Sequence, residues 1–290
     1  MHTKRILIAI TVLILASLAC GIDIDLPITT DIKTGPTVIE EIEIPGADDP
    51  DIVSDITLAF GAGELNLSPG NVSTLISGQV TYNVDDLKPE ITILNNNITI
   101  ETGNLEIDGI PNFSDQIKNI WDLKLGTKPL ALTIKAGAYS GHFDLGDIPL
   151  SNLHIADGAS DVEINFSQPN HIQMQSLRYE TGASNISLKN LANANFGTLI
   201  FESGAGNYEL DFSGTLQRDA SVFIETGLSS LTISVPDSTQ TQVKVEEGLS
   251  NITSRGSWSQ TGNTYTIPGD GHVLTINVEM KAGNLILTTH

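Results

Sequence analysis

Few residues of this chain have the types and spacing that catalysis or metal binding requires. The most suggestive group is acidic, since carboxylates that converge on one face bind calcium or act as acid and base in glycoside cleavage. It consists of Asp144, Asp147, Asp157 and Asp161. No calcium-loop motif surrounds them, and catalysis would need two acids in fixed opposition. We interpret them as solvated turn and strand residues, with cation binding or catalysis as the minority alternative.

Other residues that could carry chemistry are sparse. The six histidines have no ligand spacing, and a single cysteine excludes a thiolate cluster. Two glycine-rich triplets, at 61–63 and 204–206, are followed by neither a helix nor a phosphate-loop lysine, so they are interpreted as turns. No Ser-x-x-Lys or Gly-x-Ser-x-Gly nucleophile motif occurs. We therefore expect no cofactor, no metal site and no catalytic residue.

The chain is strongly acidic, with 14 Lys and Arg against 35 Asp and Glu and a formal net charge of −21. A protein that binds nucleic acid would present a basic stripe instead, so phosphate backbones are excluded as partners. The charge is typical of a flat, strand-rich surface that stays soluble and monomeric.

The first twenty residues have the layout of an export signal. A short basic start precedes an apolar run from Ile6, and Ser17-Leu18-Ala19 leads into Cys20. This arrangement resembles the lipobox of bacterial lipoproteins, which implies a signal peptide at residues 1–19 and lipidation of Cys20. An uncleaved membrane helix is the alternative, but the 14 residues from Ile6 to Ala19 are fewer than the ~20 that span a bilayer. We expect a lipid anchor on the outer side of a bacterial membrane.

Residues 20–51 are predicted to form an acidic tether. Asp and Glu dominate the segment, Lys33 is its one base, and four prolines interrupt it too often for a packed element. Ile42 and Ile44 alternate with acids, so an edge strand is conceivable. An extended spacer that holds the folded part away from the membrane is favoured.

A repeat of about 22 residues organises the rest of the chain. Each copy reads apolar-x-apolar, two polar residues, Gly, three mostly small residues and apolar-x-apolar, as in LRYETGASNISL from Leu177. Alternating flanks predict two short strands that meet at a glycine. Glycine is required where φ exceeds zero or where stacked turns leave no room for a Cβ. Successive glycines are 21, 24, 22, 23 and 21 residues apart: Gly137, Gly158, Gly182, Gly204, Gly227 and Gly248.

These repeats predict an all-β fold. One unit buries too few apolar residues to offset the entropy of ordering its backbone, so the units must stack. We expect a parallel β-solenoid, single-stranded and β-helix-like, with the repeat region at 127–290 and an irregular N-terminal β unit at 52–126. A two-sheet sandwich is the alternative, which explains the alternation but not the repeated glycine. Residues 112–121 are predicted as a helical turn, and residues 258–265 as a cap over an open end.

The segment from Asn119 to Ile164 resembles the bacterial toast-rack domain. Three features carry the resemblance: the run WDLKL from Trp121, the pair Pro129-Leu130 and the repeated apolar-x-apolar-x-x-Gly-Ala units. This family is related to the C-terminal domain of cell-wall-active antibiotic-response proteins and to adhesin-like repeat proteins. The resemblance covers about residues 52–290. It implies a parallel β-solenoid in a cell-envelope protein, used as an accessory or interaction domain, and it supplies no catalytic positions.

The patterns lead to one main functional hypothesis: a lipid-anchored, non-enzymatic cell-envelope surface protein that acts as a binding or adhesion scaffold for an unknown envelope protein or glycan. The alternatives are a polysaccharide-active β-helix enzyme with an acidic face and an accessory regulator of the cell-envelope stress response. Any site is expected on the outward residues of the repeats: Arg178, Glu180, Asn185, Glu202, Asn207 and Glu225.

Overall fold

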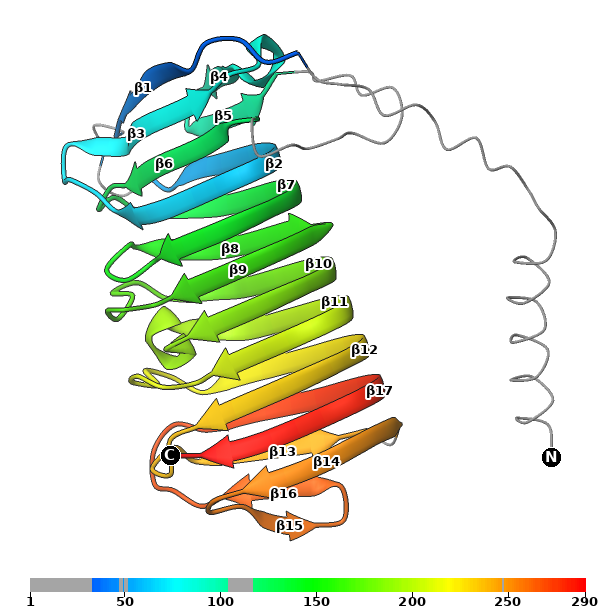
Figure 1. The fold of residues 1–290 in the computed structure, drawn as a ribbon. Helices are drawn as coiled ribbons and strands as arrows, with labels where there is room; N and C mark the ends of the chain where they lie inside the picture. The colour runs from blue at the N-terminus through cyan, green and yellow to red at the C-terminus, as the bar shows by residue number, and fades with distance from the viewer. Residues whose placement is uncertain (1–32, 47–48, 50–51, 104–116, 247) are drawn as a thin grey trace, which may run out of the picture. The chain divides into compact units, whose positions relative to one another are not determined.

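The computed structural model describes residues 33–46, 49, 52–103, 117–246 and 248–290, and these are all-β. Within them lie seventeen strands and two short 3-10 helices, η1 (Asp85–Leu87) and η2 (Leu191–Ala194) (Figure 1). The strands are β1 (Val38–Pro45), β2 (Ser54–Pro69), β3 (Thr74–Tyr82), β4 (Pro89–Leu94), β5 (Asn97–Thr102), β6 (Asn119–Leu125), β7 (Leu130–Asp144), β8 (Leu150–Asp157), β9 (Ala159–Asn165), β10 (Met174–Lys189), β11 (Phe196–Asp211), β12 (Ala220–Val235), β13 (Thr241–Val245), β14 (Leu249–Arg255), β15 (Ser259–Thr261), β16 (Thr264–Ile267) and β17 (Leu274–Thr289).

The repeated segments stack on one another as parallel strands. Leu177 of β10 pairs with Leu199 of β11, which pairs with Val222 of β12, so neighbouring strands are offset by one repeat. Long strands such as β10, β11 and β12 bend at a central glycine into a first arm before the bend and a second arm after it, and in β17 Lys281 takes the position of this glycine. We call the sheet of first arms the first layer and the sheet of second arms the second layer.

The two layers pack face to face and enclose the core. Phe201 in the first arm of β11 contacts Tyr208 in its second arm, with ring centroids 5.1 Å apart. Alternate residues on both arms point inward and are buried, as the burial of Leu177, Tyr179 and Ile186 in β10 shows. The period-2 pattern of the sequence therefore places one apolar face of each arm between the layers.

The glycines at the bend form a column in which a side chain has no room. A Cβ on Gly182 would lie 2.4 Å from the carbonyl oxygen of Gly158, and one on Gly204 would lie 2.5 Å from that of Gly182. The same holds for Gly227, 2.2 Å from the oxygen of Gly204. Close stacking of the backbone therefore explains the repeated glycine.

The N-terminal end departs from the parallel pattern. The second layer continues from β2 through β6 and β3 to β1, and the pairs β6–β3 and β3–β1 are antiparallel. The first layer continues through β5 to β4, also with an antiparallel last pair. The prediction of an acidic tether for residues 20–51 is wrong over Val38–Pro45, because β1 buries Ile42 and Ile44 against the core.

Two further expectations change. Residues 112–116 of the predicted helical turn lie outside the described residues, and Asn119–Leu125 form strand β6, in which Trp121 is buried. The strand order also differs from the sequence order near the C-terminus, since β12 pairs with the final strand β17 and not with β13. β12 and β17 are both 16 residues long and pair along their length, whereas β13 and β14 are separate short strands. Pairing with β17 therefore gives β12 the longer neighbour.

The C-terminal end of the stack is therefore built from β13 to β16. In the first layer, β13 pairs with β17, and the hairpin of β15 and β16 adds to β13. In the second layer, β14 pairs with β17 and is the last strand. The expected cap at 258–265 thus falls largely on this hairpin and lies in the first layer. No helix of membrane-spanning length and hydrophobicity occurs among the described residues.

Candidate binding grooves

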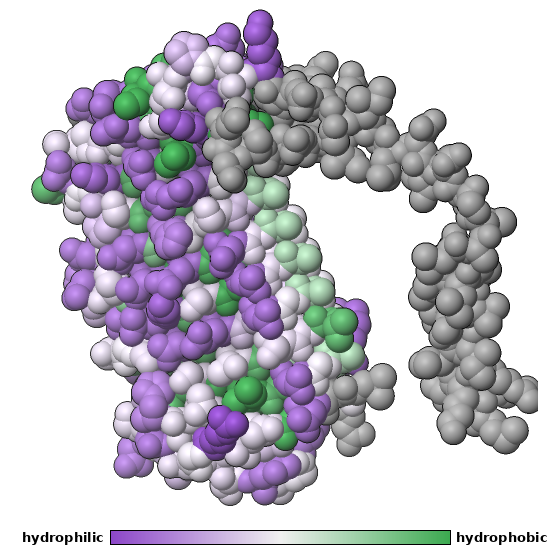
Figure 2. Space-filling model, viewed as in Figure 1, coloured by the Kyte–Doolittle hydropathy of each residue, from purple (hydrophilic) through white to green (hydrophobic). Residues whose placement is uncertain are grey.

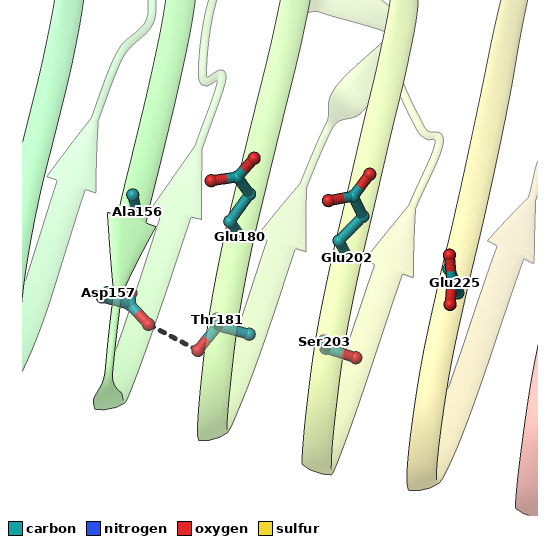
Figure 3. A pocket seen from close by; sticks show the side chains of 7 residues that line it. All are labelled: Ala156, Asp157, Glu180, Thr181, Glu202, Ser203 and Glu225. Carbon is teal, nitrogen blue, oxygen red and sulfur yellow. Dashed lines mark hydrogen bonds between the residues drawn. The ribbon is translucent and has the colours of Figure 1, made fainter.

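A row of glutamates lies on the outer face of the first layer. Glu180, Glu202, Glu225 and Glu279 take the same position on β10, β11, β12 and β17 and are register partners from strand to strand. Because neighbouring strands lie about 4.8 Å apart, this carboxylate column repeats a negative charge at every strand. Figure 3 shows its first three side chains in a row on adjacent strands. Like charges directly opposite each other destabilise a sheet, so the column needs nearby cations.

Arg178 supplies the main positive charge. Its Nη2 donates to Glu202 over 2.9 Å, and its Nε donates to Glu180. The Arg178 guanidinium holds the pKa of the Glu180 carboxyl below its ordinary value. Farther along the column, Lys281 Nζ lies 3.3 Å from Glu225 Oε1. Two side chains thus offset part of the repulsion.

An open groove of about 700 Å³ follows the carboxylate column (Figure 3). Its lining combines the outward glutamates of three strands with residues at the bend: Ala156, Asp157, Glu180, Thr181, Glu202, Ser203 and Glu225. The groove is therefore acidic along its length. A ligand that enters it must carry positive charge or hydrogen-bond donors.

Asp157 differs from the glutamates because hydroxyl groups inside the bend hold it. Its carboxylate accepts hydrogen bonds from Tyr179 Oη at 2.8 Å, Ser160 Oγ at 3.0 Å and Tyr139 Oη at 3.4 Å, and also from Thr181. Burial raises the pKa of both tyrosines, and the charge on Asp157 adds to the shift. Both phenols therefore stay neutral donors near neutral pH. This arrangement makes Asp157 a structural acceptor.

Strand β11 differs from β10 at two positions of the hydroxyl network, and one of them loses its hydroxyl group. In β10, Thr181 and Ser184 form a hydroxyl pair at 2.6 Å, whereas the matching positions of β11 are Ser203 and Gly206. A Cβ on Gly206 would lie 2.8 Å from Tyr208 Oη. The tyrosine hydroxyl therefore takes the place of the missing serine side chain, and burial raises its pKa.

The outer face of the second layer carries a second groove, of about 540 Å³. Its side chains are mostly amides and hydroxyls in register, with Asp161, Asn185, Asn207 and Ser230 on successive strands. Asn207 Nδ2 donates to Asn185 Oδ1 over 3.0 Å. This amide column therefore offers neutral donors and acceptors at Asn185, Asn207 and Ser230, and three carboxylates, Asp161, Glu163 and Glu209, also line the groove.

A ridge of small apolar residues separates the two outer faces along the bend. The residue after the bend glycine is alanine in several strands, among them Ala138, Ala183 and Ala205, and it is Leu228 in β12, which is 65% exposed. Figure 2 shows weakly hydrophobic residues in a line along one edge of the stack, beside a largely hydrophilic face.

Comparison with known protein families identifies the family to which the N-terminal part of this chain is similar. The family described as the N-terminal domain of toast_rack matches residues 34–176. The chain belongs to the toast-rack family. The match includes Asp157 and its partners Tyr139 and Ser160, but ends before Glu180. The carboxylate column therefore lies outside the matched residues.

Solved structures resemble the toast-rack chain only loosely. A candidate cell adhesion protein from Clostridium sporogenes has 20% sequence identity and a TM-score of 0.47, covering 88% of this chain and 99% of its own. A candidate adhesin from Parabacteroides merdae has 12% sequence identity and a TM-score of 0.36, covering 90% of this chain and 100% of its own. A candidate lipid binding protein from Parabacteroides distasonis has 13% identity and a TM-score of 0.35, covering 87% of this chain and 97% of its own. TM-scores below 0.5 support no statement about function. No curated protein matches the chain.

The toast-rack fold separates the four aspartates singled out in the sequence. Asp144 ends the second arm of β7 and accepts from Ser167 Oγ at 2.6 Å, and Asp147 pairs with His171 at 2.8 Å. Asp157 lies at the bend, and Asp161 faces outward from β9. They do not converge on one site. No group of three or more metal-ligating side chains occurs in the part of the chain that the structure describes, and Cys20 lies outside it.

The outward residues expected to hold a site divide between the two faces. Arg178, Glu180, Glu202 and Glu225 belong to the carboxylate column, whereas Asn185 and Asn207 belong to the amide column. Sequence reasoning missed the network around Asp157. Its members come from β7 to β10, and alternation alone gave no sign that Tyr139 and Tyr179 would meet one carboxylate.

Proposed function

We propose that this toast-rack protein is a lipid-anchored, non-enzymatic scaffold that binds another component of the bacterial cell envelope. The observation that carries the proposal is the carboxylate column, in which a glutamate recurs on three successive strands, β10, β11 and β12, along a 700 Å³ groove. Such a surface suits a partner that spans several strands. It offers many weak, equivalent contacts instead of one enclosed pocket.

The scaffold itself is proposed to be a parallel β-solenoid whose turns each contain a first arm, a glycine bend and a second arm. The parallel register of β10, β11 and β12 at one-repeat offsets supports this interpretation. The antiparallel strands at both ends and the insertion of β17 next to β12 are departures from a regular solenoid. A rigid stack of this kind keeps its outward columns in fixed register.

The absence of catalysis is part of the proposal. It is supported by the separation of the four aspartates and by the hydrogen bonds that occupy the oxygens of Asp157. Polysaccharide cleavage would need two opposed carboxylates, one to donate a proton and one to attack or to activate water. Asp144→Asn or Asp147→Asn would abolish such an activity. We expect no glycan cleavage by the wild-type chain.

The anchor is proposed from Cys20 and the apolar run before it. Lipidation would place the folded residues on the outer side of a membrane. Labelling cells with a fatty-acid analogue tests this directly: the wild-type chain should take up label and Cys20→Ser should not. Label on Cys20→Ser would refute the anchor without affecting the binding proposal.

Binding is tested with the full chain in pull-down and glycan-array experiments. The wild type should retain an envelope protein or glycan. The triple variant Glu180→Gln, Glu202→Gln, Glu225→Gln should retain at least tenfold less of this partner. A matched control removes the same charge elsewhere, by Glu41→Gln, Glu43→Gln and Glu90→Gln on β1 and β4. Equal losses in both variants, or no partner for the wild type, would contradict the proposal.

A further inference from the structure

The second layer ends before the first layer at the C-terminal end of the stack. β14 pairs with β17 on one side and with no strand on its other side among the described residues. In the first layer, β16 and β15 add to β13, so this layer continues for two more strands (Figure 1). The free edge of β14 therefore faces a step in which one strand or a pair of strands is missing.

The side chains at this step are those of an unfinished core. Ile252 of β14 is in register with Leu285 of β17, yet Ile252 is 36% exposed and Leu285 is fully buried. Ser254 follows the same inward direction, opposite buried Leu287, and is also exposed. In the first layer, by contrast, the hairpin keeps Val243 buried.

The indole of Trp258, which follows β14 in the chain, adds to this evidence. Its Nε1 is buried and has no hydrogen-bond acceptor in the described part of the chain. Buried donors are nearly always satisfied in complete structures. Five other buried side-chain atoms of the described residues also lack a partner, so the evidence for an unfinished end is mainly the missing apolar cover over Ile252.

The free edge of β14 carries fewer protecting features than the other edge strands, since its only charged residue is Arg255, at its end. Edge strands are commonly blunted by charge, proline or short length. β1 carries three glutamates, β4 begins Pro89-Glu90, and β15 has three residues. β14 has seven residues, with neither an acid nor a proline.

The balanced charge at this end favours an acidic partner, which the acidic surface elsewhere would repel. Residues 241–267 contain two bases, Lys244 and Arg255, against two acids, in a chain of net charge −21. The outward residues of β14 that follow Asn251 are Thr253 and Arg255. A neutral or acidic segment therefore meets no repulsion on this edge, and an acid beside Arg255 gains a cross-strand pair.

We propose that the free edge of β14 binds one extended segment of another protein, which adds as a strand to the second layer. The segment has apolar residues at alternate positions, which cover Ile252, and an acidic residue on its outward side next to Arg255. Main-chain hydrogen bonds along the edge provide affinity, and the alternation provides specificity. This interaction is separate from the carboxylate column and does not depend on it.

A second copy of the chain does not fit this edge through its own β14. A two-fold pairing of β14 with β14 would make the second layers continuous. The two hairpins of β15 and β16 would then need the same space in the first layer, because each extends two strands beyond β14. A single strand avoids this overlap.

A synthetic peptide with the sequence of β9, Ala159–Asn165, is the probe. Within the stack this strand turns Val162 and Ile164 inward and Asp161 and Glu163 outward, which is the chemistry that the edge requires. The labelled peptide is titrated into the full chain in detergent micelles, followed by anisotropy. A control peptide exchanges Val162 and Glu163, which puts the acid on the core side. We expect saturable binding of the first peptide and at least tenfold weaker binding of the control.

Hydrogen exchange locates the bound peptide. Amides of β14 should exchange at least tenfold more slowly with the β9 peptide, while those of β1 and β4 should not change. Ile252→Lys should weaken binding tenfold or more, and Arg255→Glu should weaken it severalfold without touching the core. The matched control Phe223→Lys changes a 48% exposed apolar residue of β12, which is paired on both sides, and should bind the peptide as the wild type does.

Three results would overturn the proposal. The first is no binding of the β9 peptide to the wild-type chain. The second is protection of β1 or β4 amides in place of β14. The third is a doubled mass of the wild-type chain that Ile252→Lys returns to that of one chain, because the edge would then be occupied by a second copy.

Discussion

The middle and the C-terminal end of the stack differ in how neighbouring strands cover the inward residues. In the middle, β11 and β12 each have a neighbour of equal length on both sides, and their inward residues Leu199 and Leu231 are fully buried. At the C-terminal end, the strands shorten, the pairing becomes antiparallel in one layer, and Ile252 is left partly exposed in the other. The comparison shows that each repeat is completed by the next one, so stability is shared between neighbours.

The largest effect is expected where stacking is tightest. Gly206 has a φ of +153°, and a Cβ there would lie 1.8 Å from the carbonyl oxygen of Ser184. Gly206→Ala should lower the free energy of unfolding by about 4 kcal/mol or more, because backbone must move. Gly271, at the C-terminal end, has nothing within 4 Å of a Cβ, so Gly271→Ala should change stability by less than about 0.5 kcal/mol. Chemical denaturation of both variants measures the difference, and equal losses would contradict close stacking as its cause.

A smaller difference is expected for the inward column of the second layer. Leu285 is buried and its register partner Ile252 is 36% exposed. Leu285→Ala should cost about 3 kcal/mol, within the usual range for a buried leucine. Ile252→Ala should cost about 1 kcal/mol, because part of its surface already meets water. If Ile252→Ala costs as much as Leu285→Ala in denaturant titrations, the end of the stack is covered in solution.

Alkaline pH should weaken the middle of the molecule. The pKa values of Tyr139 and Tyr179 are raised in the folded state, so their contribution to stability is complete below the ordinary tyrosine pKa of about 10 and is lost as the pH rises above it. Each phenol should remove about 1.4 kcal/mol per pH unit in that window. Denaturation midpoints between pH 9 and 11 measure this slope. The double variant Tyr139→Phe, Tyr179→Phe should have a shallower slope, and an unchanged slope would refute the assignment.

The smallest effect is expected on the solvent-exposed carboxylate column. Arg178→Gln should raise the pKa of Glu180 toward its ordinary value and cost less than about 1 kcal/mol, because both partners are partly exposed and screened by salt. Carboxylate titration by NMR follows the pKa. Lys281→Gln, which removes a more exposed ion pair with Glu225, should have a still smaller effect. A cost that does not grow at low ionic strength would contradict an electrostatic origin.

Repetition made the interior of the array predictable. The columns through Gly182, Gly204 and Gly227 follow from equal spacing, because parallel strands of one repeat place equal positions side by side. For β1, the alternation of Ile42 and Ile44 left an edge strand open, but the prolines and acids favoured a tether, and burial against β3 outweighed local propensity. The candidate site was predicted as a set of outward residues, but not as two grooves of different chemistry.

The sequence by itself determined which residues face inward, where the chain must bend and which outward side chains recur. These are local properties, set by a period of two and by glycine at fixed intervals. Only the tertiary structure decided that β17 lies beside β12, that Tyr139 and Tyr179 meet at Asp157, and that β14 keeps a free edge. The physical reason is that similar repeats can pair with one another in several orders. The choice among them depends on matched strand length and on burial at the ends, which are properties of the whole stack.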